Sequence, residues 1–153
     1  MQLIVFTGIP ASGKSTFYQQ YFYHTHLRLN LDMLKTRHRE RLLFEAALSS
    51  QTKIVIDNTN PSAQDRQRYI QAAQTLGYDI VSYYFDTDLR SAIARNHQRQ
   101  GKAKIPVVGI KTKFKQLEVP QYSEGFSDIY QVHIVSNGQF GIRHMPNDSE
   151  EHA

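Results

Sequence analysis

The sequence contains no cysteine among its 153 residues. This absence excludes disulfide bonds, thiolate metal sites and catalysis by a cysteine nucleophile, and it suits a reducing compartment. The chain also has no run of about 18 apolar residues, so we expect no transmembrane span. Its first residues lack the basic segment, apolar stretch and cleavage site of a secretory signal. We therefore expect a cytoplasmic protein.

Acidic residues are scarce in one stretch of the chain. Residues 88–115 contain eight lysines and arginines but one acidic residue, and the formal net charge of the whole chain is +4. Such a balance fits a polyanionic partner, although many basic proteins bind no nucleic acid. A solvated helix face is the ordinary explanation for a basic run. A lid over a bound phosphate compound is the alternative, because Arg95 and Arg99 share one face of a predicted helix that ends near Gly101.

Short apolar runs alternate with helical patterns along nearly the whole chain. Strands are predicted at residues 2–8, 27–32, 53–60 and 78–86, with a last strand, an Asn-Gly turn and a return strand within residues 130–144. Helices are predicted at residues 12–24, 32–50, 61–77, 87–101 and 107–119. The apolar set of the second helix is Leu34, Leu42, Leu43, Phe44, Ala47 and Leu48. This alternation predicts an α/β fold with a mostly parallel sheet, in one domain at residues 1–143 with a frayed polar tail at residues 144–153.

Residues 8–15, GIPASGKS, fit the pattern G-x-x-x-x-G-K-S between a predicted strand and a predicted helix. Glycines let backbone amides turn toward phosphate oxygens, and the following helix presents its positive N-terminal end. Lys14 would reach the β- and γ-phosphates of ATP, and Ser15 would ligate Mg²⁺. The predicted nucleotide-binding residues are Gly8, Ile9, Pro10, Ala11, Ser12, Gly13, Lys14, Ser15 and Thr16, with Arg95 and Arg99 if the lid closes.

Two aspartates end predicted strands, at the edge where open α/β folds bind ligands. Asp57 ends KIVID, and beside a P-loop we expect it to hold Mg²⁺ with Ser15 or to bind substrate, although it could be a turn residue. Asp32 ends LRLNLD, where it would accept the proton of an attacking hydroxyl or else only cap the next helix. The basic patch KTRHRER, residues 35–41, follows Asp32 as either an acceptor surface or a solvated face.

The segments GIPASGKST, LNLD, VIDNTNPSAQDRQRYI and RNHQRQGKAKIP follow one another in the order seen in 5′-polynucleotide kinases of the phage and mammalian DNA-repair type. YSEGFSDIYQV also looks like the end of the mammalian kinase domain. The chain resembles this family over roughly residues 1–135. The P-loop is common to many families, whereas IDNTNP with its downstream arginines is much more specific, although related ATP-binding tRNA-modification factors share something similar.

The resemblance implies a P-loop kinase fold with a five-stranded, mostly parallel sheet, helices on both faces and a helical lid. It implies transfer of the γ-phosphate of ATP, with Mg²⁺, to a 5′-hydroxyl end of DNA or RNA. Lys14 and Ser15 match the family's P-loop pair, Asp32 matches its general base, and Arg95 and Arg99 match its lid arginines. The substrate-binding residues predicted together with the basic patch are Asp32, Lys35, Arg37, Asp57, Asn58 and Asn60.

The chain departs from this family on the acceptor side. Polynucleotide kinases usually have an arginine where this chain has Leu31, and the phage-type enzyme has another where this chain has Lys35. Lysine keeps the charge but lacks the bidentate fork of arginine. Three functions stay open: a polynucleotide 5′-kinase, a small-molecule kinase on the same fold, and an ATP-binding accessory factor of an RNA-modifying machine. The basic patch favours the first, the missing arginine keeps the second open, and Asp32 speaks against the third because a switch needs no acceptor base.

Overall fold

The computed structural model describes residues 1–135 and 138–148. Six strands form one sheet in the order β2-β3-β1-β4-β5-β6. They are β1 (Gln2–Thr7), β2 (Leu27–Leu29), β3 (Ile54–Ile56), β4 (Asp79–Phe85), β5 (Asp128–Ile134) and β6 (Phe140–Met145). The first five pair in parallel, and β6 is antiparallel to β5. The predicted α/β class and the mostly parallel sheet are confirmed.

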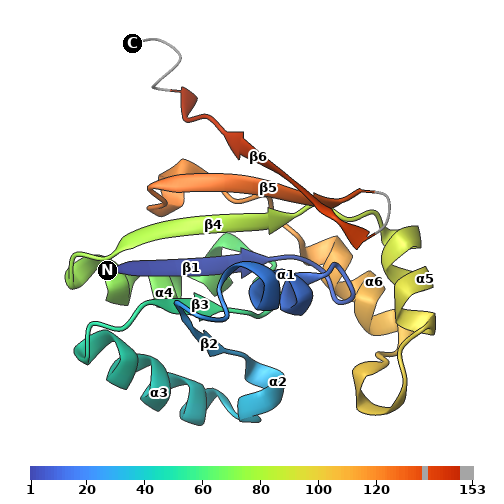
Figure 1. Ribbon diagram of the computed structural model, residues 1–153, viewed down its shortest axis with the longest axis horizontal. Coiled ribbons are helices and arrows are strands. Elements are labelled where there is room, and N and C mark those ends of the chain that lie inside the picture. The colour runs from blue at the N-terminus through green and yellow to red at the C-terminus, as the bar shows by residue number, and fades with distance from the viewer. Residues whose placement is uncertain (136–137, 149–153) are drawn as a thin grey trace.

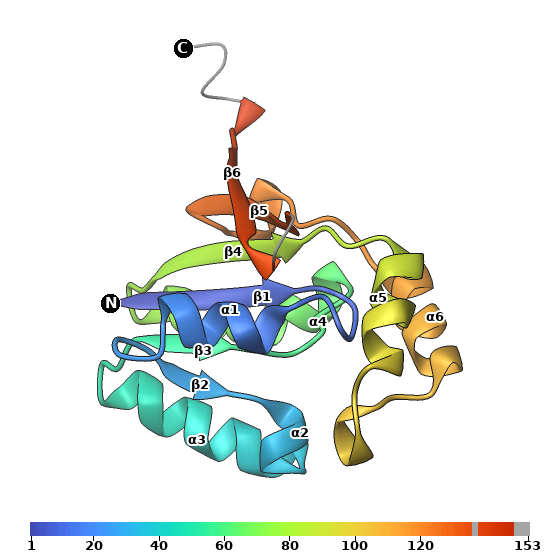
Figure 2. The same cartoon turned by 45° about the vertical axis from the view of Figure 1, so that its right-hand side comes forward.

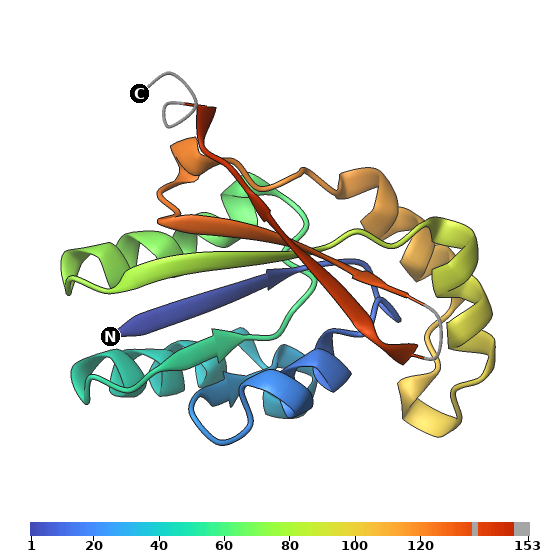
Figure 3. The same ribbon diagram turned by 45° about the horizontal axis from the view of Figure 1, so that its top comes forward.

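The sheet has one strand more than the five that the resemblance implied. β6 is added because the chain turns back after β5, and Figure 3 shows it crossing the view diagonally. At the start of β6, the ring of Phe140 meets Phe17 of the helix after the P-loop, with 5.1 Å between ring centroids. The turn predicted at Asn137 and Gly138 lies partly outside the described residues, as do residues 149–153 of the predicted tail.

Helices cover both faces of the sheet (Figure 1). They are α1 (Lys14–Tyr21), α2 (Leu31–Leu34), α3 (Arg37–Ser49), α4 (Ala63–Thr75), α5 (Leu89–His97) and α6 (Val107–Gln116), with short 3₁₀ turns η1 (Gly101–Ala103) and η2 (Tyr122–Glu124). Because side chains alternate along a strand, Leu3 and Val5 of β1 pack toward α3 and α4, whereas Ile4 and Phe6 pack toward α1. No helix in the described part of the chain is long and apolar enough to cross a bilayer.

The single helix predicted at residues 32–50 is wrong. The chain leaves helical geometry at Lys35, whose φ is 79°, and Thr36 then caps α3 by accepting a hydrogen bond from the Arg39 amide. Within the predicted apolar set, Phe44, Ala47 and Leu48 are buried, but Leu42 and Leu43 are exposed. α3 lies along the edge of the sheet, so only one stripe of the helix meets the core (Figure 1).

The lid helices α5 and α6 lie beyond the carboxyl ends of the strands (Figure 2). They pack on each other and on the P-loop through a small cluster of Ile9, Ala92 and Ile110. Asp88 is the N-cap of α5, where its side chain accepts from the Ser91 amide, and α5 ends at His97, before the predicted end near Gly101. The carboxyl ends of β1 and β3, α2 and the lid therefore surround one region.

Candidate nucleotide and acceptor site

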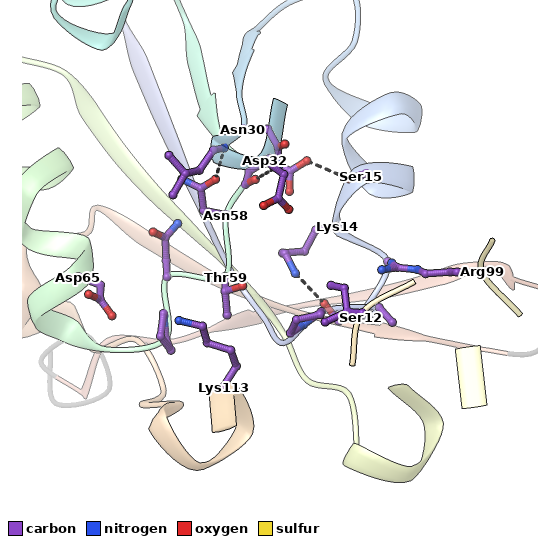
Figure 4. A pocket seen from close by; sticks show the side chains of 18 of the residues that line it. Ser12, Lys14, Ser15, Asn30, Asp32, Asn58, Thr59, Asp65, Arg99 and Lys113 are labelled. Carbon is purple, nitrogen blue, oxygen red and sulfur yellow. Dashed lines mark hydrogen bonds between the residues drawn. The ribbon is translucent and has the colours of Figure 1, made fainter. Parts of the chain in front are cut away.

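A pocket of about 270 Å³ lies at the carboxyl edge of the sheet. Its walls come from four parts of the chain: residues 10–15 of the P-loop; residues 30–32 with Arg37; residues 57–61 with Asp65; and Arg99, Ile105 and Lys113 of the lid. Figure 4 shows Lys14 and Asp32 on two sides of this hollow, with Arg99 and Lys113 coming from the lid. The pocket thus joins the predicted nucleotide cradle to the predicted acceptor side.

The P-loop takes its shape from residues in unusual backbone conformations. Ala11 and Gly13 have φ of 64° and 94°, and α1 begins directly after Gly13. Gly8 is required by close packing, because a Cβ there would lie 2.7 Å from Ser12 Oγ and 2.8 Å from Phe85 Cβ. Such a loop, followed by a helix N-terminus, is suited to bind phosphate.

Lys14 folds back over the loop that precedes it. Its ammonium group donates to the carbonyl oxygens of Gly8 and Ile9, both at 2.9 Å, and to Ser12 Oγ at 3.4 Å. Burial of the ammonium group lowers the pKa of Lys14 to about 8, and the nearby Arg99 adds to this, whereas Asp57 and other carboxylates oppose it. A phosphate group would replace these carbonyl oxygens as the partner of the charge.

The predicted metal pair, Ser15 and Asp57, is brought together. Ser15 Oγ donates to Asp57 Oδ2 at 3.2 Å, and the Asp57 side chain is 1% exposed. The sequence analysis missed Arg28, whose Nε lies 2.7 Å from the same Asp57 oxygen and whose Nη2 donates to Ser15 Oγ at 3.0 Å. The only signal in the sequence is an arginine inside an otherwise apolar strand.

The oxygens of Ser15 and Asp57 fit a magnesium ion, and they fit it only as part of a larger shell. Mg²⁺ takes six oxygens, and in nucleotide sites one or two carboxylates combine with phosphates and water. The described residues contain no cluster of three or more His, Cys, Asp or Glu that could hold a metal by themselves. Ser15 and Asp57 could therefore hold a metal ion only together with oxygens from a bound ligand, such as phosphate oxygens, or from water.

Asp32 lies in the first turn of α2, but it does not cap that helix. Asn30 is the N-cap: its Oδ1 accepts from the Met33 amide at 3.0 Å, and its Nδ2 donates to the Asp57 carbonyl at 2.6 Å. The exposed Asp32 carboxylate has no hydrogen bond or ion pair to any described residue, and it lines the pocket. Since Asn30 is the cap, the Asp32 carboxylate is free to bind a group that enters the pocket.

Asn58 and Arg37, which line the pocket, belong to a polar cluster with Glu40 and Tyr69. The sequence analysis did not predict this cluster. Asn58 donates to Glu40 Oε2 at 2.8 Å and accepts from the Leu31 amide at 2.7 Å. Arg37 Nη1 lies 3.0 Å from Glu40 Oε1 and donates to the Tyr69 hydroxyl at 2.9 Å. Burial and the Glu40 carboxylate raise the pKa of Tyr69 to about 12. These contacts hold both pocket-lining side chains in fixed positions.

Hydrogen bonds from buried side chains hold the loop after Asn58 in place. Asn60 is buried and donates to the Phe6 carbonyl at 2.8 Å. Arg66, which is fully buried, donates to the carbonyls of Asn60 and Pro61 and pairs with Glu124 through two bonds of 2.7 and 2.9 Å. Asn60 lines the pocket, but its side-chain amide nitrogen is used to hold the loop against the backbone of β1.

The two predicted lid arginines lie in different places. Arg99 lines the pocket, and its Nη1 donates to the Ala103 carbonyl at 3.2 Å. Arg95 is not among the lining residues; its Nε donates to the Ala11 carbonyl of the P-loop at 2.7 Å, and its buried Nη2 has no partner in the described chain. Burial lowers the pKa of Arg95. Of the other predicted residues, Gly8, Ile9, Thr16 and Lys35 also lie outside the pocket wall.

Known proteins are similar to this chain in sequence and in fold. Residues 3–118 match the sequence model of a family described as an AAA domain. The chain is 32% identical over 138 residues to a putative bifunctional polynucleotide phosphatase/kinase of Acanthamoeba polyphaga mimivirus, and 28% identical over 135 residues to a bifunctional polynucleotide phosphatase/kinase of Schizosaccharomyces pombe. Each alignment covers 86% of this chain and 33% of the relative, so the chain spans about one third of these relatives. The crystal structure of Chaetomium thermophilum Kti12 in complex with ADP-AlF3 is similar in fold, with a TM-score of 0.69 at 15% identity over 86% of this chain and 88% of that one.

Proposed function

The chain belongs to the AAA domain family of P-loop proteins, and on this premise we propose that it is an ATP-dependent kinase that phosphorylates a 5′-hydroxyl end of DNA or RNA. The observation that carries the proposal is the single pocket that holds both Lys14 of the P-loop and the unpaired carboxylate of Asp32. A protein that only binds nucleotide as a switch needs no acceptor base. A kinase needs both groups within reach of one transferred phosphate.

The chemistry follows from what each side chain can do. When bound, magnesium ATP supplies the phosphoryl group that is transferred. The hydroxyl oxygen of the acceptor forms a bond to the γ-phosphorus, the bond from that phosphorus to the β–γ bridging oxygen breaks, and ADP leaves with the electron pair. The proton of the hydroxyl passes to a carboxylate oxygen of Asp32. Lys14 and Arg99 neutralise the charge on the transferred group, and Ser15 with Asp57 would hold the metal ion.

Support for a nucleic acid acceptor comes from two directions. The names of the relatives that are 28% and 32% identical to this chain refer to polynucleotides. The pocket wall also carries Arg37, which Glu40 and Tyr69 hold in place and whose side chain is still 49% exposed. A cation fixed in this way can bind a phosphate without losing much side-chain entropy.

The acceptor is tested by a transfer assay with γ-labelled ATP. A 5′-hydroxyl oligodeoxynucleotide, a matching oligoribonucleotide and a panel of hydroxylated metabolites compete at equal concentration. The proposal expects label at an oligonucleotide end, and the Asp32→Asn variant serves as the background. Preferential labelling of a metabolite would identify a small-molecule kinase instead.

A small-molecule kinase is the second candidate because of Leu31. This residue lines the pocket beside Asp32, where the resembled family usually has an arginine. An apolar side chain there removes one contact to an acceptor phosphate and favours a less charged acceptor. Leu31→Arg separates the two candidates: the variant should lower the KM for an oligonucleotide if the acceptor carries a phosphate there, and should not if the acceptor is neutral.

A further inference from the structure

Arg28 occupies the oxygens that the metal ion would need. Its Nε lies 2.7 Å from Asp57 Oδ2, and its Nη2 lies 3.0 Å from Ser15 Oγ. We propose that Arg28 is a built-in counter-cation that competes with the divalent metal ion for Ser15 and Asp57 and leaves them when the metal–nucleotide complex binds. The inference rests on the proposed metal pair, and it does not depend on the identity of the acceptor.

Sheet register places this arginine on the pair. Arg28 of β2 is in register with Val55 of β3, and Asp57 follows two residues later on the same face of the sheet. That face is the one covered by α1, and Ser15 lies in the first turn of α1. The guanidinium carbon also lies 5.9 Å from the ring centroid of Tyr18. Strand, helix and ring together direct the Arg28 side chain to the two oxygens.

Arg28 and a metal ion exclude each other. The Asp57 carboxylate is 1% exposed, and an unpaired charge at such a depth is costly, so one cation is needed there. Two cations on the same carboxylate oxygen would repel each other. Ser15 Oγ accepts from Arg28, so the arginine uses a lone pair that a metal ion would also take. The Arg28 side chain is 26% exposed, so it can swing toward solvent.

Because Arg28 competes with the metal ion, binding of the metal ion depends on binding of the nucleotide. A metal ion alone gains only the two protein oxygens and must displace Arg28. A metal ion that arrives on a nucleotide brings phosphate oxygens with it, and the phosphates also gain Lys14 and the loop amides. We therefore expect weak binding of free metal and strong binding of the metal–nucleotide complex. Removing the Arg28 charge should weaken this coupling by strengthening the binding of free metal.

The test measures free Mn²⁺ binding by electron paramagnetic resonance without nucleotide. Arg28→Met removes the competing charge and keeps the length of the stem. Arg68→Met, on the exposed side of α4, changes the net charge equally and is the matched control. We expect Arg28→Met to bind Mn²⁺ about tenfold more tightly than the wild type, and Arg68→Met to stay within about twofold of it. Equal affinities for the two variants would overturn the proposal.

A second measurement uses only the wild-type protein, so its result does not depend on whether a variant folds. The ¹⁵N resonance of the Arg28 Nε–H group is followed while MgADP is added. We expect its carboxylate-bonded shift to disappear at saturation. A resonance that keeps this shift in the saturated protein overturns the proposal while leaving the kinase assignment intact. Failure of wild type and Arg28→Met alike to bind MnADP would overturn the metal pair and this inference with it. Transfer to the acceptor is not measured in either experiment, so a wrong acceptor assignment affects neither result.

Discussion

The ammonium group of Lys14 has a pKa of about 8, lowered by burial in the P-loop. Bound phosphate would stabilise the charged form and raise this pKa, so nucleotide binding takes up a proton above pH 8 and none well below it. We expect the affinity for ADP to be nearly constant around pH 7, to be about halved at pH 8 and to fall by up to about tenfold per pH unit above it. Calorimetry in buffers of different ionisation enthalpy measures both quantities. Lys14→Met should bind weakly at every pH, and a flat wild-type profile up to pH 9.5 would contradict the interpretation.

Asp32 gives a second prediction at the scale of one side chain. Asp32→Asn keeps the shape of the residue but cannot take a proton at neutral pH. We expect phosphoryl transfer to fall by about 10²–10⁴-fold while the affinity for nucleotide changes little. Asp79→Asn, an exposed aspartate at the start of β4, is the control. Because Asn30 caps α2, the thermal stability of Asp32→Asn should match that of the wild type, and transfer at the wild-type rate would remove Asp32 from the mechanism.

The two lid arginines lie at different points of the lid, Arg95 within α5 and Arg99 two residues beyond its end at His97, and the structure separates their roles. Arg99 lines the pocket, so Arg99→Ala should lower kcat by about 10²–10³-fold, as expected for loss of a donor to a charged transition state. Arg95 bonds the P-loop carbonyl of Ala11, so Arg95→Ala should raise the KM for ATP as well as lower kcat. Arg90→Ala, which is exposed on α5, is the control.

Steady-state kinetics and thermal melts of the Arg90, Arg95 and Arg99 variants decide between a catalytic and a structural lid. Both lid variants should lose more activity than stability, because partly exposed charges contribute little to folding. Lower melting temperatures with unchanged kinetics in Arg95→Ala and Arg99→Ala would assign both residues to structure.

At the level of elements, the sequence predicts whether a segment is a helix or a strand better than it predicts where that segment begins and ends. Alternating apolar runs and the P-loop motif were sufficient for the α/β class, because both signals are local. The break after α2 was missed because lysine gives no sign of positive φ, and Lys35 adopts a φ of 79°. The sequence analysis considered only Asp32 as a possible cap of the helix that follows it, whereas Asn30, two positions earlier, is the N-cap of α2.

At the level of the whole molecule, the features that the sequence did not predict are contacts between segments that lie far apart in the chain. Arg28 reaches Asp57 through the parallel register of β2 and β3, which no local pattern encodes. Glu40 reads as an exposed residue in a charged helix, yet it is 3% exposed and bonded to Asn58 and Tyr69. The predicted site residues follow a motif, whereas the residues that position them come from elements brought together only by folding.

The path of the acceptor over the molecule gives the last prediction. Arg37 lines the pocket, and Arg41 lies one turn farther along α3 on the same side, whereas Arg39 is turned away by about 200°. An oligonucleotide that leaves the pocket past Arg37 would therefore meet Arg41 next.

Arg41→Glu should raise the KM for a 5′-hydroxyl oligonucleotide severalfold and leave the KM for ATP unchanged. Arg39→Glu is the matched control, with the same change of charge on the same helix. If a single-stranded acceptor is used, the slope of log affinity against log salt should become shallower by about 0.7 in Arg41→Glu, the share of one phosphate contact. Arg37→Glu is a poor probe because it would also break the Glu40 and Tyr69 contacts. Equal KM values for Arg39→Glu and Arg41→Glu would show that the acceptor does not run along α3.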